Sequence, residues 1–167
     1  DYVFYEREII NLFATGRRWM GEEFSIENQQ SFTLPFPNAA PNENIAVTVR
    51  AAAVSPLSSS MEVSANSQNL FTMTFGGNNP TSLILATDQV QSAIFPNSSN
   101  TVNVSINYSN GGNPSARGYL DYIEVVGKKN LVANDFQFGF RSFDAANTAG
   151  VVEYQLQGAS NISQLWD

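Results

Sequence analysis

The feature that most constrains the fold is an alternation of apolar and polar residues that recurs along much of the chain. In Thr101–Ser109 every second side chain is apolar, and Thr, Asn and Ser fill the positions between. The same period of two occurs around Phe32–Phe36, Ile45–Ala53, Met61–Ala65 and Phe71–Phe75. Successive side chains of a β-strand point to opposite faces of its sheet, so each stretch predicts a strand with one buried face.

Turn residues separate these stretches. Gly-Gly-Asn-Asn-Pro follows Phe75 and Asn-Gly-Gly-Asn-Pro follows Ser109, and both are strong turn signals. Further strands are expected over Leu83–Leu85, Tyr119–Lys129, Phe136–Phe143 and Val151–Gln157. Roughly nine or ten short strands with regular turns predict an all-β fold. The expected architecture is an antiparallel β-sandwich that is jelly-roll-like, as in galactose-binding-like domains. No stretch is long enough for the helical crossovers of a parallel sheet.

The first 24 residues differ from the rest because they are rich in charge. Of the 23 charged residues of the chain, nine fall within residues 1–27. Glu6–Phe13 has apolar residues at helical spacing and predicts either a short helix or an amphipathic strand, ended by Thr15-Gly16. We therefore expect an irregular or helical lead-in segment, residues 1–24, which can pack on the sandwich, followed by the β-sandwich domain, residues 25–167.

Composition excludes most kinds of active site. The 167 residues include no cysteine and no histidine, which removes disulfides, thiolate zinc sites and His-dependent nucleophilic triads. Carboxylates are the remaining acid–base groups. Asp121 and Glu124 lie in one predicted strand at a spacing that places them on opposite faces, so they would not converge on a substrate. The sequence thus predicts no catalytic residue, no metal site and no cofactor.

The charge balance also restricts the partners. Eight basic and 15 acidic residues give a net charge of −7, which disfavours binding to nucleic acid. Only 14% of the residues are charged, and Asn, Ser, Thr and Gln dominate the polar positions. Cytosolic domains usually carry about a quarter charged residues. This composition is more typical of exported β-proteins.

One segment stands out as a candidate site. Trp19 lies between Gly16 and Gly21 among charged residues, in the sequence GRRWMGE. It either caps one end of the sandwich with an arginine beside its ring, or forms a docking surface for a neighbouring domain. The candidate binding residues on the second interpretation are Arg17, Trp19 and Glu22.

Two stretches of the chain, YEREIINLFATGRRWMGEEF at the start and the region from Tyr119 to the end, resemble a known family. They are similar to the noncatalytic β-domain that precedes the peptidase domain of gingipain-like cysteine peptidases of the type IX secretion sortase kind, the PorU-like proteins. The matching positions are Gly16, Arg17, Trp19, Gly21 and Glu22, then Leu120–Val125, and finally Ile162, Ser163, Trp166 and Asp167. The residues between these stretches, Gln29–Gly118, resemble the family only in their general character and carry no matching motif.

The resemblance implies an accessory or interaction domain of an exported peptidase at the outer membrane or cell surface. The family's catalytic dyad is Cys-His, so no catalytic residue carries over to this chain. The implied partners are the adjacent peptidase domain of the same polypeptide, and secretion-system proteins or cargo. A carbohydrate-binding jelly-roll module is the alternative, and it needs exposed aromatic residues on one face or at the loop ends. A structural spacer without a ligand is a third interpretation.

Overall fold

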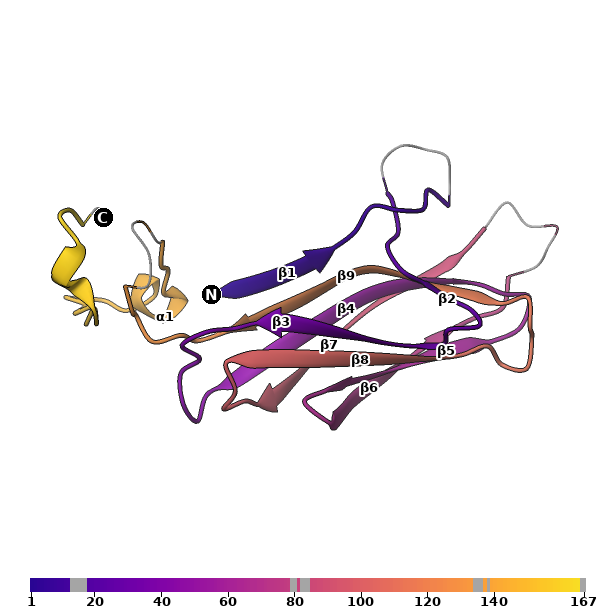
Figure 1. The fold of residues 1–167 in the computed structure, drawn as a ribbon, viewed down its shortest axis with the longest axis horizontal. Helices are drawn as coiled ribbons and strands as arrows, with labels where there is room; N and C mark the ends of the chain where they lie inside the picture. Colours follow the sequence, from indigo (N-terminus) through magenta and orange to yellow (C-terminus); the bar gives the residue numbers. More distant parts are fainter. Residues whose placement is uncertain (13–17, 79–80, 82–84, 134–136, 138, 166–167) are drawn as a thin grey trace.

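A computed structural model describes residues 1–12, 18–78, 81, 85–133, 137 and 139–165. Two antiparallel sheets lie face to face (Figure 1). The five-stranded sheet has the order β1-β9-β4-β7, with β2 on the same edge of β9 as β1, and the four-stranded sheet has the order β3-β8-β5-β6. The strands are β1 Tyr2–Glu6, β2 Glu23–Phe24, β3 Gln29–Pro35, β4 Asn44–Val54, β5 Ser59–Ala65, β6 Gln68–Phe75, β7 Thr87–Pro96, β8 Thr101–Ser109 and β9 Arg117–Gly127.

The chain passes from one sheet to the other at almost every connection after β2. Among the described strands that follow β2, β5 and β6 are the one consecutive pair within a sheet, and they form a hairpin. Every pair of strands is antiparallel. The prediction of an antiparallel, jelly-roll-like β-sandwich is therefore confirmed.

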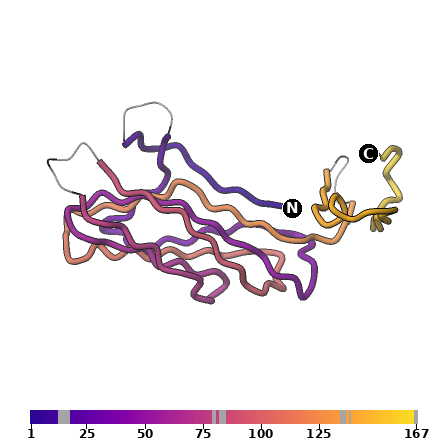
Figure 2. Tube along the Cα trace, turned by 180° about the vertical axis from the view of Figure 1, so that it is seen from behind, coloured from indigo at the N-terminus to yellow at the C-terminus, as the bar shows by residue number. Residues whose placement is uncertain are grey.

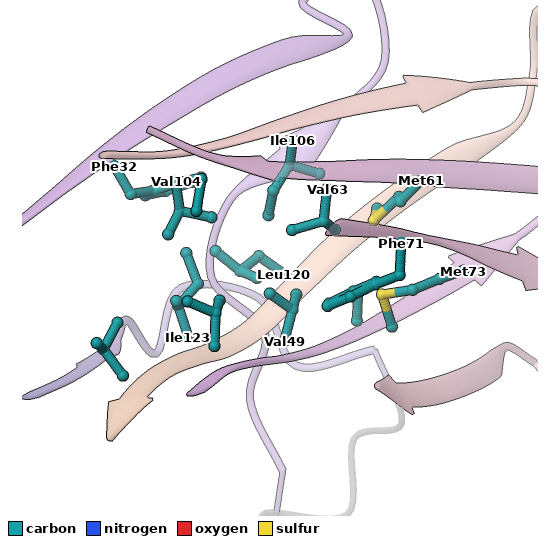
Figure 3. Packing of buried hydrophobic residues seen from close by; sticks show 14 of the residues in the cluster. Phe32, Val49, Met61, Val63, Phe71, Met73, Val104, Ile106, Leu120 and Ile123 are labelled. Carbon is teal, nitrogen blue, oxygen red and sulfur yellow. The ribbon is translucent and has the colours of Figure 1, made fainter. Parts of the chain in front are cut away.

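The core lies between the two sheets and follows the period of two in the sequence (Figure 3). The strands that the pattern predicted contribute the alternate residues of their predicted buried faces, as in Val102, Val104 and Ile106 of β8. Val49 of β4 and Leu120 and Ile123 of β9 meet them from the facing sheet. All six of these side chains are fully buried, so removal of apolar surface from water is the main stabilising contribution.

Gly118 is a point of close approach between the sheets. A Cβ atom added there would lie 2.5 Å from Met61 Cε and 2.9 Å from Tyr108 Cδ2, both of the opposite sheet. Glycine is therefore needed at this position of β9 because a side chain would push the sheets apart.

Three expectations about individual segments are wrong. Val151–Gln157 forms no strand, and in Phe136–Phe143 the described residues belong to no sheet, with helix α1, Phe143–Ala146, beginning at the last of them. Leu85, the described residue of the predicted strand Leu83–Leu85, belongs to no sheet and is about half exposed. The expectation of an irregular or helical N-terminal segment left two alternatives open. The segment opens with β1, and its described residues hold no helix, so they follow the irregular alternative. Predicted positions outside the described residues are Phe13, Gly16, Arg17, Leu83, Ile84, Phe136, Phe138, Trp166 and Asp167.

The strands β1 and β7 were not expected from the sequence. β7 is an edge strand that exposes most of its side chains, so burial imposes little alternation on it. β1 alternates as Tyr2, Phe4 and Glu6 against Val3 and Tyr5, but it is only five residues long.

The chain leaves the sandwich after β9. Asp1 and Gly127 are hydrogen-bonded through the Asp1 ammonium and the Gly127 carbonyl at 2.8 Å, and Lys129 forms an ion pair with the Asp1 carboxylate at 2.8 Å. Residues 131–165, called the C-terminal segment below, include α1 and a 3₁₀ turn at Ala159–Asn161. Figures 1 and 2 place this segment beyond the end of the sandwich at which Asp1 lies. No helix within the described part of the chain is long and apolar enough to cross a membrane.

Candidate interaction surface

The outer face of the five-stranded sheet is divided by a β-bulge. On β4 and β9, Arg50 pairs with Tyr122 but Ala51 pairs with Leu120, so Asp121 is an extra residue on β9. The bulge changes the phase of the strand. Asp121 consequently lies beside Arg50 on the outer face, the face that Glu124 also occupies through its pairing with Thr48. The expectation that Asp121 and Glu124 point to opposite faces is wrong for this reason.

At one end of the sheet the outer face is covered by described residues of the segment 7–20, namely residues 7–12 and 18–20, and the segment is called the N-terminal excursion. β1 runs along one edge of β9 as far as Tyr122, and residues 21–24 resume pairing with the same edge at Leu120. The excursion is therefore an insertion into what is otherwise one edge strand. Its ends meet the sheet on either side of Asp121.

Apolar contacts hold the excursion in place. Met20 is 1% exposed and packs against Ala52 of β4 and Tyr119 of β9. Ile10 and Leu12 pack on the same cluster, and Ile10 forms an isolated bridge with Met20 through backbone bonds of 2.7 and 2.8 Å. Ala52 is fully buried although it lies on an outer face.

A second anchor is polar and lies at the edge of the sheet. Glu22 Oε1 accepts hydrogen bonds from Tyr5 Oη at 2.6 Å and from Arg7 Nη1 at 3.1 Å. The Glu22 side chain is 11% exposed. Burial raises the pKa of Tyr5, and the hydrogen bond to the Glu22 carboxylate raises it further. These contacts join the end of β1 to the start of β2.

Four charged side chains lie under and beside the excursion. Arg50 Nη2 donates to Asp88 Oδ2 at 2.8 Å and its Nε lies 3.4 Å from Asp121 Oδ2. Arg18, from the excursion, reaches the same two oxygens at 3.2 and 4.0 Å. The excursion is thus attached by ion pairs to both β7 and β9.

The two carboxyl groups of this cluster respond differently to their surroundings. Asp121 is 6% exposed, and its burial raises its pKa despite the arginines beside it. The hydrogen bond from Arg50 lowers the pKa of Asp88, which is more exposed. Each arginine contacts both acids, so a deprotonated Asp121 stays paired although it is buried.

The other end of the same outer face is open. Three rows of residues in register cross the sheet from β1 to β7 there, each row having one residue from each of four strands. The rows are Tyr2, Val126, Ala46 and Ile94; Phe4, Glu124, Thr48 and Ser92; and Glu6, Tyr122, Arg50 and Val90. Ile94 is 70% exposed and Tyr2 is 64% exposed. These three rows are called the open half below.

An aromatic pair and two carboxylates occupy the edge of the open half. The rings of Phe4 and Tyr122 are stacked, with centroids 5.1 Å apart and an angle of 30° between planes. Glu124 lies next to Phe4 in register and Glu6 next to Tyr122. Within the described part of the chain, neither carboxylate has a hydrogen-bond or ion-pair partner.

The residues proposed from the sequence as a docking patch lie at the covered end. Trp19 belongs to the excursion and is partly exposed. Glu22 instead turns to Tyr5 and Arg7, and no hydrogen bond joins it to Trp19. Arg17 lies outside the described residues. A docking role for Arg17, Trp19 and Glu22 stays a prediction.

The open half was not found from the sequence. The alternation of Tyr2 and Phe4 with Val3 and Tyr5 was a usable signal, since an aromatic on each face of a strand leaves one of them outside. The bulge that places Asp121 beside Arg50 has no comparable signal.

The outer face of the four-stranded sheet is of a different kind. Hydroxyl and amide side chains occupy it, with Ser31 bonded to Ser105 at 2.8 Å and Thr33 to Asn103 at 3.0 Å. At its end lies a shallow depression of about 360 Å³, lined by Ser25, Ile26, Asn28, Asn107, Tyr108, Ser109 and Asn110. No group of three or more acidic side chains that could hold a metal ion occurs among the described residues.

The C-terminal segment exposes large apolar side chains. Phe143 is 79% exposed and Val151 is 100% exposed. Tyr154 and Leu165 are also exposed, and Asp144 of the segment forms an ion pair with Lys128, which follows β9, at 3.1 Å. Exposed apolar surface is typical of interaction surfaces.

Solved structures provide the comparison with known proteins. The fold matches part of dimeric latent PorU from Porphyromonas gingivalis with a TM-score of 0.74 and 20% sequence identity, over 90% of this chain and 14% of that chain. The chain therefore spans about one seventh of the length of that protein. The match confirms, at the level of fold, the resemblance to a PorU-like domain.

Carbohydrate-binding modules are more distant neighbours. The CBM36-1 domain of a xylanase from the hindgut metagenome of Trinervitermes trinervoides matches with a TM-score of 0.49 and 11% identity, over 77% of this chain and 98% of that one. A CBM36 module in complex with calcium and xylotriose matches with a TM-score of 0.46 and 15% identity, over 75% and 99% of the two chains. No protein-family profile and no curated protein sequence matches the chain.

Proposed function

We propose that this chain is a noncatalytic accessory domain of an exported, gingipain-like cysteine peptidase of the PorU type, and that it packs against the peptidase domain of the same polypeptide. The observation that carries the proposal is the exposed apolar surface of the C-terminal segment. Phe143, Val151 and Leu165 are strongly exposed and lie outside the core between the sheets, and such apolar surface supports packing against a further domain.

Two other observations support this proposal. The chain has neither cysteine nor histidine, so a Cys-His dyad would have to be supplied by another part of the polypeptide. The fold corresponds to a small part of a much longer PorU chain. Export to the outer membrane or cell surface, and contact with cargo or secretion-system proteins, belong to the same proposal and are supported by the sequence resemblance and the low content of charged residues.

The experiment begins with the coding sequence on both sides of Asp1 and Asp167. The proposal expects an α/β domain with one histidine and one cysteine in the same reading frame. Hydrogen–deuterium exchange then compares residues 139–165 in the 167-residue chain and in the longer polypeptide. We expect strong protection only in the longer form, because packing closes backbone groups that are open in the isolated chain. A reading frame without a peptidase, or equal exchange in both forms, would contradict the proposal.

A carbohydrate-binding function is the second candidate, and one observation favours it. Phe4 and the nearby Tyr2 are exposed aromatic groups on one face, and the half-buried Tyr122 ring is stacked on Phe4. The depression on the other sheet offers amides and hydroxyls, but its aromatic residue, Tyr108, is buried. Titration of the chain with cellotriose, xylotriose and maltotriose, followed by NMR, tests this function. Shifts confined to residues of β1 and β9 would favour it, and unchanged spectra would exclude these sugars.

A further inference from the structure

We infer that the open half of the five-stranded sheet is the docking surface for a basic region of the neighbouring domain, which contributes an arginine or lysine side chain to the Phe4–Tyr122 pair and Glu124. The inference rests on the proposed function and goes further, because it names the face that is covered and the chemistry of the residues that cover it.

The first argument is the distribution of apolar surface. Tyr2 on β1 and Val90 and Ile94 on β7 are all more than half exposed, and Phe4 of β1 and Val126 of β9 are also exposed in the same rows. Single exposed apolar residues are ordinary, but a contiguous group on a flat sheet face is typical of an interface. The opposite sheet provides the contrast, since its outer face carries hydroxyl and amide groups bonded to one another.

The second argument is charge complementarity. Glu124 is half-buried beside Phe4 and has no cation within reach in the described residues, whereas the nearest arginine in the rows, Arg50, is engaged by Asp88 and Asp121. A guanidinium group stacks on aromatic faces and pairs with carboxylates through two parallel hydrogen bonds. The stacked rings with Glu124 and Glu6 on either side therefore suit a partner's arginine better than a neutral or acidic group.

The same charges argue against a second copy of this chain as the occupant. A face-to-face pair of copies would bring the unpaired Glu124 and Glu6 of one copy towards those of the other, on a chain of net charge −7. Like charges brought together in an interface cost several kcal/mol. A basic partner removes this cost.

The third argument is position. The chain leaves the sheet at Gly127, in contact with Asp1, and the C-terminal segment continues from that end of the sandwich (Figure 2). Tyr2 and Val126, which form the first row of the open half, lie next to this exit. A domain that follows the C-terminal segment is thus tethered beside the open half, and tethering raises its effective concentration there.

The test is carboxyl footprinting of the longer polypeptide with a carbodiimide and glycine ethyl ester, read by peptide mass spectrometry. We expect labelling of Glu124 to fall several-fold relative to the 167-residue chain. Glu62, on the outer face of the four-stranded sheet, is the internal control and should keep its labelling rate. Equal labelling of Glu124 in both forms would overturn the inference. If Glu124 were labelled equally but the C-terminal segment were still protected from exchange in the longer polypeptide, the proposed function would stand and only this inference would fail.

Charge reversal provides the second measurement. Glu124→Lys in the longer polypeptide should raise the rate of exchange in the C-terminal segment by about tenfold or more, because a buried charge pair is replaced by a repulsive one. Glu62→Lys is the matched control and should have little effect. Equal effects of the two substitutions would overturn the inference. Protection of Glu124 by an added neutral oligosaccharide, in the isolated chain, would assign the face to a glycan instead.

Discussion

The two outer faces of this sandwich differ in the side chains that they present to solvent. On the four-stranded sheet, short polar side chains bond to one another across strands, as Ser31 does with Ser105 and Glu62 with Asn69. On the five-stranded sheet, the chain covers one end with its own N-terminal excursion and leaves aromatic, aliphatic and unpaired acidic groups at the other. Exposed apolar surface is typical of interaction sites, whereas a face of paired polar groups is well solvated by water. The proposed docking surface accordingly lies on the five-stranded sheet.

The largest expected effect comes from the core that both sheets share. Leu120→Ala should lower the free energy of unfolding by about 2–5 kcal/mol, because it removes a fully buried side chain between the sheets and leaves a cavity. Urea unfolding followed by circular dichroism measures this change. Leu57→Ala, at a half-exposed position, is the control and should change the free energy by less than about 0.5 kcal/mol.

The covered and open halves of the outer face can be compared directly. Met20→Ala should cost about 2 kcal/mol or more, since Met20 is buried between the excursion and the sheet. Val126→Ala on the open half should cost less than about 0.5 kcal/mol in the isolated chain because Val126 is exposed. Equal losses in urea unfolding would mean that the excursion does not cover its end of the sheet.

The charge cluster beneath the excursion should show two opposite dependences on pH. Asp121 has a raised pKa in the folded chain, so its contribution to stability is present below its unfolded pKa and is lost as the pH rises through the folded value. Asp88 has a lowered pKa, so its contribution is present above the unfolded pKa and is lost as the pH falls through the folded value. Carboxyl NMR titration should place the midpoint of Asp121 above 3.8 and that of Asp88 below it. A reversed order would contradict the arrangement described.

The smallest effect is expected on the polar face. Ser31→Ala should lower the free energy of unfolding by about 1 kcal/mol or less, since the hydrogen bond to Ser105 is exposed to water. A double-mutant cycle with Ser105→Ala measures the coupling of the pair. A loss as large as that of Met20→Ala would show that the polar face contributes to the fold as strongly as the covered one.

Sequence periodicity predicted much of this fold because burial enforces it. Val104 and Ile106 alternate with Asn103 and Ser105 since one face of β8 meets the core and the other meets water. The same reasoning predicted strands at Phe136–Phe143 and Val151–Gln157, where alternation exists but the described residues join neither sheet. It missed β7, which has little burial to impose a pattern.

The site was harder to predict than the fold. Trp19 stood out in the sequence, but the charged residues that hold its segment, Arg50, Asp88 and Asp121, come from three separate strands. These three side chains come together because of the strand order and the bulge at Asp121. The alternation of apolar and polar residues predicts neither of them. The open half likewise requires knowing that β1 extends the sheet.

The excursion also has a consequence for how such a domain can change over evolution. Its two ends join the same edge of β9 on either side of Asp121, with Gly21 N bonded to the Leu120 carbonyl at 2.6 Å. Residues can therefore be added or removed between Arg7 and Met20 without altering the register of β1 or β2. The entropy of closing a loop grows slowly with its length, by about 0.6 kcal/mol for each doubling. The N-terminal excursion is therefore a position at which insertions can change the surface of the domain while the two sheets keep their pairing.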